Sequence, residues 1–145
     1  MDDGVILLVE DNPRDEELTL RAFRRSGIAN PIEVARDGAE ALDRLLGRGN
    51  FAADPLPQVV LLDLKLPKID GLEVLRTLRA TERTALLPVV VLTSSVEEQD
   101  LVRSYSLGAN SYVRKPVDFN QFAEAIRQLG LYWMVLNRPA PRGRS

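Results

Sequence analysis

Three runs of apolar residues divide the chain, and each run ends in polar side chains. The runs cover residues 5–9, 59–62 and 89–92, and each contains at least two β-branched residues. A strand with one solvated face alternates apolar and polar positions, so these unbroken runs predict strands that are buried on both faces. Two of the strands end in carboxylates and the third in a hydroxyl; these residues are Glu10, Asp11, Asp63 and Thr93.

Apolar positions at helical spacing predict a helix after each strand. Residues 14–26 form the first helix, behind the Asn-Pro pair that commonly starts one, and further helices follow at 39–46, from 72, up to 107 and after 118. Ser95 and Glu98 have the spacing of a capping box for the fourth helix. Shorter strands are expected at 32–35 and 111–116. Five strand-helix units predict an α/β fold with a doubly wound five-stranded parallel sheet in the order 2-1-3-4-5.

The last helix carries apolar residues on two faces. One stripe is expected to pack on the sheet; it consists of Phe122, Ile126, Leu129, Trp133 and Leu136. A second face carries Leu131, Tyr132 and Val135, where a solvated helix normally has polar residues. We expect this second face to be the interface of a homodimer. Alternatively, Gly130 ends the helix, and these residues form an edge strand or a tail that covers the core.

Composition restricts the chemistry that the chain can perform. It has 145 residues, 45% of them hydrophobic, which suffices for one sizeable core but not for two ordinary domains. Without Cys or His, the chain has no thiol nucleophile, no Ser-His-Asp triad and no Cys or His zinc site. A net charge of -2 offers no basic surface for nucleic acid or an anionic membrane. No apolar run approaches the length of a membrane span, so we expect a cytoplasmic protein.

Polar residues at the strand ends converge on one edge of the predicted sheet. Asp11 and Asp63 follow neighbouring strands, and carboxylates placed side by side repel unless a cation lies between them. Carboxylate and carbonyl oxygens suit Mg²⁺. Thr93 and Lys115, at two further strand ends, could face the metal. This arrangement favours phosphoryl chemistry with an attacking carboxylate over a merely structural cluster.

Five motifs in chain order together resemble the receiver domain of two-component response regulators. The resemblance extends from residue 4 to residue 130 and implies a flavodoxin-like (βα)5 fold. The motifs are Glu10-Asp11, the run from Asp63 to Pro67 with Asp70-Gly71, Thr93-Ser94, Gly108-Ala109 and Lys115-Pro116.

The resemblance also implies a role for each residue of the site. Asp63 would accept a phosphoryl group from the phosphohistidine of a sensor histidine kinase, with Mg²⁺ as cofactor. Asp11, Asp63 and the backbone carbonyl of Lys65 would hold the Mg²⁺, and Glu10 would reach it through water.

Three further residues would respond to the phosphoryl group. Lys115 would pair with its oxygens, Thr93 would donate its hydroxyl to them, and Tyr112 would change rotamer on phosphorylation. The peptide bond before Pro116 is expected to be cis. Residues 110–112 and 115–119, the loop at 47–57 and the Tyr132-Trp133 ending are similar to regulators paired with phytochrome-type light-sensing kinases.

Two other functions fit part of the pattern. A metal-dependent phosphohydrolase with an aspartyl-phosphate intermediate commonly has a second acid two residues after the nucleophile, where this chain has Lys65. A receiver-like interaction module without phosphotransfer usually lacks an acid or the lysine, whereas Asp11, Asp63 and Lys115 are all present.

Residues 1–137 are expected to form the receiver domain with a C-terminal helical extension, and residues 138–145 a flexible tail. The 29 residues from 117 to 145 are too few for a DNA-binding or enzymatic domain. We therefore expect a regulator that is not an enzyme beyond its own phosphorylation and dephosphorylation. Its partners would be the sensor kinase, a downstream protein or phosphotransfer partner, and a second copy of itself, with no nucleic acid or membrane.

Overall fold

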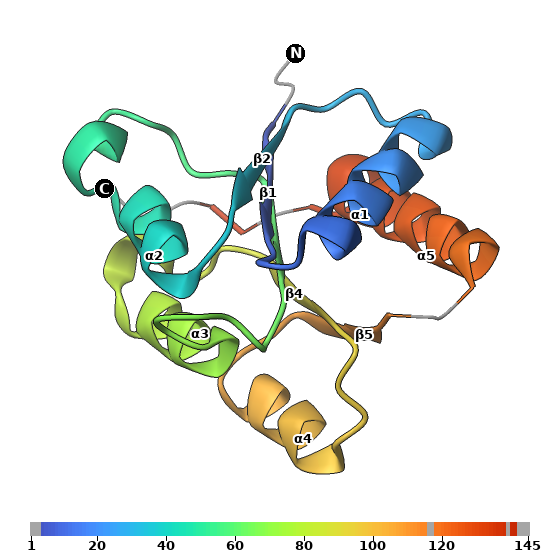
Figure 1. The fold of residues 1–145 in the computed structure, drawn as a ribbon. Helices are drawn as coiled ribbons and strands as arrows, with labels where there is room; N and C mark the ends of the chain where they lie inside the picture. The colour runs from blue at the N-terminus through green and yellow to red at the C-terminus, as the bar shows by residue number, and fades with distance from the viewer. Residues whose placement is uncertain (1–3, 116–117, 139, 142–145) are drawn as a thin grey trace.

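The chain folds into a five-stranded parallel sheet between two layers of helices, as a computed structural model shows (Figure 1). The structure describes residues 4–115, 118–138 and 140–141. The strands are β1 (Ile6–Val9), β2 (Ile32–Ala35), β3 (Val59–Leu62), β4 (Val89–Thr93) and β5 (Ser111–Arg114). They lie in the order β2-β1-β3-β4-β5, which confirms the predicted topology.

A helix follows each strand at nearly the predicted bounds. These helices are α1 (Pro13–Ser26), α2 (Gly38–Leu46), α3 (Gly71–Ala80), α4 (Glu98–Ser106) and α5 (Phe119–Leu131). Short 3₁₀ turns lie at Gly49–Phe51 and Glu82–Thr84, and a π-helical turn follows α5 at Tyr132–Leu136. Among the described residues, no helix combines the length and the apolar character needed to cross a membrane.

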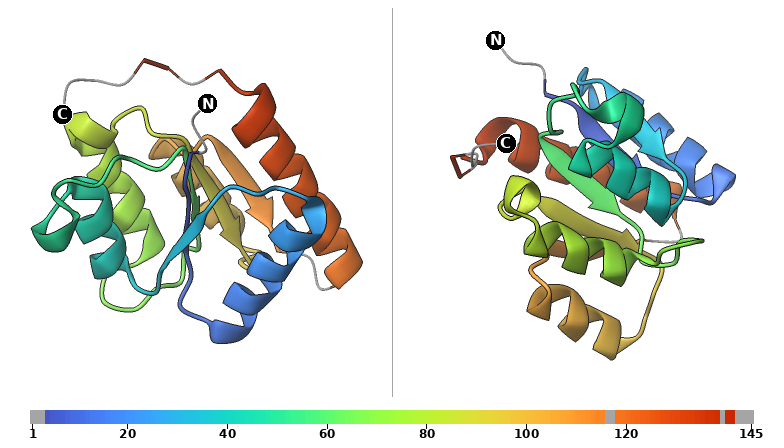
Figure 2. Two further views of the ribbon diagram at one scale, coloured as in Figure 1. Left: turned by 90° about the horizontal axis from the view of Figure 1, so that it is seen from above. Right: turned by 90° about the vertical axis from the view of Figure 1, so that its left-hand side faces the viewer.

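Side-chain alternation on the buried strands builds one core on each face of the sheet. In β1, Ile6 and Leu8 pack toward α1 and α5, whereas Leu7 and Val9 pack toward α2 and α3. β3 and β4 alternate in the same way, because successive side chains of a strand point to opposite faces. Both faces are therefore covered by helices, and the carboxyl ends of the strands form one common edge (Figure 2).

The end of the chain differs from the predicted stripe. α5 passes through Gly130, which is buried; a Cβ there would overlap the Ile28 side chain, so glycine lets α5 lie close to the loop after α1. Trp133 packs inward as predicted, but Leu136 is 60% exposed, so its assignment to the inner face was wrong. The π-helical turn adds a residue to the helical repeat and rotates Leu136 outward.

The start of α4 differs from the predicted cap. Ser95 does not form the predicted capping box, because α4 starts at Glu98 with Glu97 as the N-cap residue. The Ser95 hydroxyl donates to Asp100 at 2.6 Å and accepts the Glu97 N–H at 3.3 Å. The peptide bond before Pro116 and much of the predicted tail lie outside the described residues.

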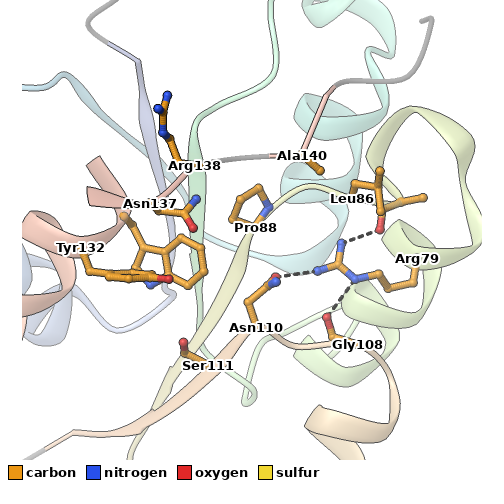
Figure 3. Close-up of a pocket in the computed structure, with 12 residues that line it drawn as sticks. Arg79, Leu86, Pro88, Gly108, Asn110, Ser111, Tyr132, Asn137, Arg138 and Ala140 are labelled. Carbon is orange, nitrogen blue, oxygen red and sulfur yellow. Dashed lines mark hydrogen bonds between the residues drawn. The ribbon is translucent and has the colours of Figure 1, made fainter. Parts of the chain in front are cut away.

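Arg79 of α3 holds the amino-terminal edge of β4 and β5 together (Figure 3). Its guanidinium donates to the carbonyls of Gly108, Thr84 and Ala85 at 2.9–3.2 Å and to the Asn110 side chain at 2.9 Å. The Asn110 side chain in turn accepts the N–H of Val89 at 2.8 Å. These contacts line a pocket of about 650 Å³ at the edge of the sheet opposite the carboxylates, with Tyr132 on its far wall (Figure 3).

We expect Arg79→Lys to lower the free energy of unfolding by about 1–3 kcal/mol, because an ammonium cannot reproduce the planar fork that satisfies these acceptors. Urea denaturation measures the change. Arg76→Lys is the matched control on the same helix, since its bonds to Glu73 are exposed, and its unfolding midpoint should not change. Equal losses in the two variants would contradict the role given to Arg79.

Candidate phosphoacceptor and metal site

Three carboxylates meet where β1 and β3 end. Glu10 and Asp11 follow β1, and Asp63 follows β3, which is the neighbouring strand. One carboxylate oxygen from each residue lies within 4.8 Å of the others. Glu10 and Asp63 are 1% and 8% exposed, whereas Asp11 is open to solvent. The end of the sheet therefore carries a group of three carboxylates, two of them buried and the third open to solvent, so that a cation could reach it.

Lys115 approaches this group from the end of β5. Its backbone N–H donates to the Thr93 carbonyl at 2.7 Å, which brings the ends of β5 and β4 together. Its ammonium, on a side chain only 9% exposed, donates to Glu10, to Asp63 at 3.3 Å and to Asp15 at 3.1 Å. Four carboxylates thus surround the site with one ammonium between them.

Burial and the neighbouring charges both shift the pKa values of Glu10 and Lys115. Burial raises the pKa of Glu10 to about 7, aided by the charge of Asp63 and opposed by the hydrogen bond from Lys115. Burial also disfavours the charged form of Lys115, but the hydrogen bond to Glu10 and the charges of Asp63 and Glu10 outweigh it and raise the pKa of Lys115 to about 12. The ammonium is therefore permanent, and a further cation beside Glu10 would relieve the remaining repulsion.

The donor set fits a hard divalent cation. Carboxylates, a backbone carbonyl and water are the ligands that such ions prefer. The loop after β3 follows Asp63 directly, and the N–H of Lys65 lies 3.4 Å from an Asp63 carboxylate oxygen, so the Lys65 peptide is at the site. This loop would supply the predicted carbonyl ligand.

The loop after β3 is held against the turn before α2. The Gly38 N–H donates to the Pro67 carbonyl at 3.3 Å, and the Lys68 ammonium pairs with Asp37 at 3.4 Å. A Cβ on Gly38 would overlap the Ile69 carbonyl oxygen. Glycine at position 38 therefore lets the loop that contains Lys65 lie close to α2.

The predicted switch residues occupy the two strands beside the site. Thr93 is fully buried at the end of β4, and its hydroxyl oxygen accepts the Ser95 N–H at 3.2 Å. Tyr112 pairs with Val91 across β4 and β5 and is half-buried against the core. Its hydroxyl is buried without a hydrogen-bond partner among the residues that the structure describes.

Sequence reasoning missed one neighbour of the site and assigned another only in part. Asp15, at the start of α1, contacts Lys115 although 100 residues separate them. Its signal was the cap at Asn12, whose side chain accepts the Asp15 N–H and fixes the first turn. Glu10 was expected to act on the metal through water, but its carboxylate also contacts Lys115 directly. The predicted interface residues Leu131, Tyr132 and Val135 lie away from the site, and all three are exposed.

Comparison with known proteins agrees with this geometry. A family described as "Response regulator receiver domain" matches residues 6–127. The probable methanogenesis regulatory protein FilR2 of Methanothrix harundinacea is 46% identical over 142 residues, which cover 97% of this chain and 90% of FilR2. Response regulator Rcp1 of Synechocystis is 36% identical over 130 residues, covering 90% of this chain and 88% of Rcp1.

Solved structures share the fold over almost the whole chain. The phosphorylated cyanobacterial phytochrome response regulator RcpA is 34% identical with a TM-score of 0.89, covering 95% of this chain and 99% of its own. The Mn²⁺-bound form of Rcp1 has the same identity and coverage and a TM-score of 0.88. The bacteriophytochrome response regulator AtBRR is 57% identical with a TM-score of 0.76, covering 95% of this chain and all of its own.

We expect Gly38→Ala to weaken binding of a divalent cation about threefold to tenfold, because the displaced loop carries the Lys65 carbonyl away from the carboxylates. Mn²⁺ titration followed by electron paramagnetic resonance measures the affinity. Gly27→Ala is the control, since it also places alanine at a helix end, with a positive φ of 82°, but has no atom of the site nearby. Unchanged Mn²⁺ affinity in a folded Gly38→Ala protein would refute the link between this contact and the site.

Proposed function

We propose, from the premise that this chain belongs to the response regulator receiver family, that Asp63 accepts a phosphoryl group from the phosphohistidine of a sensor histidine kinase. One observation carries the proposal: the buried Asp63 carboxylate belongs to the group of three carboxylates that could hold a cation and also contacts the buried ammonium of Lys115. An Asp63 oxygen attacks phosphorus and forms the new P–O bond, while the P–N bond breaks and its electron pair returns to the imidazole.

The cofactor that we propose is Mg²⁺, held by Asp11, Asp63 and the Lys65 carbonyl, with Glu10 reaching it through water. When bound, the ion neutralises phosphoryl oxygens as negative charge collects on them. Support comes from the three converging carboxylates and from the Mn²⁺-bound structure of Rcp1. The other polar contacts with the phosphoryl group would be made by side chains of the protein itself.

Lys115 and Thr93 would receive the phosphoryl group. The Lys115 N–H that donates to the Asp63 carboxylate would then donate to an oxygen of the phosphoryl group on Asp63. The Thr93 hydroxyl accepts the Ser95 N–H and can still donate its own proton to a phosphoryl oxygen. Tyr112 buries an unsatisfied hydroxyl, which costs about 1–3 kcal/mol, so a rotamer that reaches a partner would be favoured once Thr93 moves.

We expect Asp63→Asn to abolish phosphorylation while the fold persists, because the amide has nearly the same shape but is a poor nucleophile. Intact-mass measurement after incubation with acetyl phosphate and Mg²⁺ reads the result. Asp70→Asn is the matched control: Asp70 lies in the same loop but caps α3, a role that Asn also performs, so this variant should gain one phosphoryl group.

The same experiment separates the other two functions. A stable gain of one phosphoryl group by the unaltered protein supports the receiver. Turnover of a small phosphate substrate would support a phosphohydrolase, and no change in mass would support an inert interaction module. Phosphorylation of Asp63→Asn at another residue would overturn the assignment of Asp63.

For the kinase, we propose a phytochrome-type sensor, with signal output through phosphorylation-dependent binding of a downstream protein or phosphotransfer partner. The names of RcpA and AtBRR support the light-sensing assignment, whereas FilR2, which is 46% identical to this chain, is named a probable methanogenesis regulatory protein. The chain would act in the cytoplasm, where a kinase draws on ATP, and would catalyse nothing beyond its own phosphorylation and dephosphorylation. Its receiver unit would extend over residues 1–137, with 138–145 as a tail.

A homodimer through the end of α5 is the proposed assembly. Leu131, Tyr132 and Val135 are 42%, 49% and 67% exposed. Leu131 and Val135, with Met134 and Ile28, line a hollow of about 320 Å³ between the end of α5 and the loop after α1. A second copy presenting the same apolar side chains could fill this hollow and bury both surfaces.

We expect the Tyr132→Glu, Val135→Glu double variant to be monomeric where the unaltered protein is dimeric, because two carboxylates cannot be buried in an apolar interface. Light scattering at high micromolar concentration, with and without beryllofluoride and Mg²⁺, gives the mass. Val96→Glu, Val102→Glu is the matched control, since it places two charges on exposed apolar positions at α4. A dimer disrupted by the control alone, or a monomer in every state, would refute the proposed interface.

A further inference from the structure

Asp15 supplies the Lys115 ammonium with a partner that comes from a different part of the fold. It is the third residue of α1, and its N–H bonds to the Asn12 side chain at 3.1 Å, so the cap fixes its place in the first turn. Its carboxylate accepts a hydrogen bond from the Lys115 ammonium at 3.1 Å. The contact joins α1 to the end of β5, across the edge of the sheet where Asp63 lies.

Asp15 differs from the other two partners of Lys115 in one respect. Glu10 and Asp63 both belong to the group of three carboxylates that converge closely enough to hold a metal ion. Asp15 lies outside that group. With a cation bound and Asp63 esterified, Glu10 would share its charge between the ammonium and the cation, and Asp15 would be the one of these three carboxylates dedicated to the ammonium.

We propose that Asp15 is a positioning residue that holds the Lys115 ammonium against the phosphoryl group on Asp63. This inference rests on the function proposed above. An ammonium has three N–H donors, and three carboxylates accept from it here. While Asp15 and Glu10 hold two donors, the third points at Asp63 and meets a phosphoryl oxygen there without a new side-chain rotamer.

The exposure of the two side chains suits this division of roles. The Lys115 side chain is 9% exposed and depends on nearby carboxylates for its charge, whereas the Asp15 side chain is 34% exposed and keeps much of its hydration. A half-hydrated carboxylate can stabilise a buried cation at a small desolvation cost of its own. Its negative charge also disfavours a phosphoryl group, but water screens that longer-range repulsion more than the direct contact with Lys115.

The test compares beryllofluoride binding, in the presence of Mg²⁺, with Mg²⁺ binding alone. We expect Asp15→Asn to weaken beryllofluoride binding about fivefold. This loss of affinity lies between that expected for removing an exposed ion pair and that expected for removing a buried charged hydrogen bond. Mg²⁺ affinity should change less than the beryllofluoride affinity, because Asp15 is not in the metal group. Titration calorimetry gives both constants, and Asp15→Glu should recover at least part of the loss.

Two controls exclude a general effect of charge or structure. Glu17→Gln removes one carboxylate from the outward face of α1 and should leave both affinities unchanged. In a Lys115→Gln background, Asp15→Asn should no longer weaken beryllofluoride binding, because the residue acts through the ammonium. An equal loss in both backgrounds, or wild-type affinity in Asp15→Asn, would overturn the role of Asp15 alone. Failure of the unaltered protein to bind beryllofluoride would instead overturn the proposed function.

Discussion

The candidate site depends on one shared cation, the buried ammonium of Lys115. Glu10, Asp15 and Asp63 all present negative charge to it, and Asp11 adds a fourth carboxylate in the open mouth of the site. One ammonium cannot balance this charge, and burial, with the charge of Asp63 as a smaller cause, raises the pKa of Glu10 to about 7. Four carboxylates around one ammonium therefore favour the uptake of a divalent cation at this site.

The parallel sheet makes it possible to hold this charge cluster in a stable fold. β1, β3, β4 and β5 run side by side, and their side chains are buried or half-buried except for the exposed Arg114 at the end of β5, so the polar residues after the strands emerge at one edge. Apolar packing on both faces of the sheet stabilises the strands, and the unfavourable carboxylate contacts are confined to the residues beyond the strand ends. A helix start on each side then adds fixed groups: α1 brings Asp15, and the turn before α2 holds the loop that contains Lys65.

The opposite edge of the sheet has different chemistry. Arg79 ties backbone carbonyls together there, and the turn after α5 places Trp133 against the core, where its carbonyl accepts a hydrogen bond from Gln58 at 3.1 Å. The apolar side chains that follow are exposed and border a hollow. The candidate site and the surface proposed for self-association thus lie at opposite edges of the sheet, and α5 extends from one edge toward the other, as Figure 1 shows.

The sequence by itself determined the strands, their order and the residues at their ends. The unbroken apolar runs at β1, β3 and β4 favour strands buried on both faces, and alternation with helices favours a parallel sheet whose carboxyl ends converge. The positions of Asp11, Asp63, Thr93 and Lys115 along the chain therefore suffice to group them at one edge. The start of a helix can also be predicted from a few neighbouring residues, as Asn12 and Pro13 show at the start of α1.

Only the tertiary structure decided which partner each polar group takes. The contact of Asp15 with Lys115 spans 100 residues, and the bond of Ser95 to Asp100 replaces the capping box that local spacing favours. Leu136 turns outward where the chain forms a π-helical turn, a change of repeat that a regular pattern of 3.6 residues per turn does not predict. In each case, competition among several suitable neighbours sets the outcome, and the geometry of the folded chain selects among them.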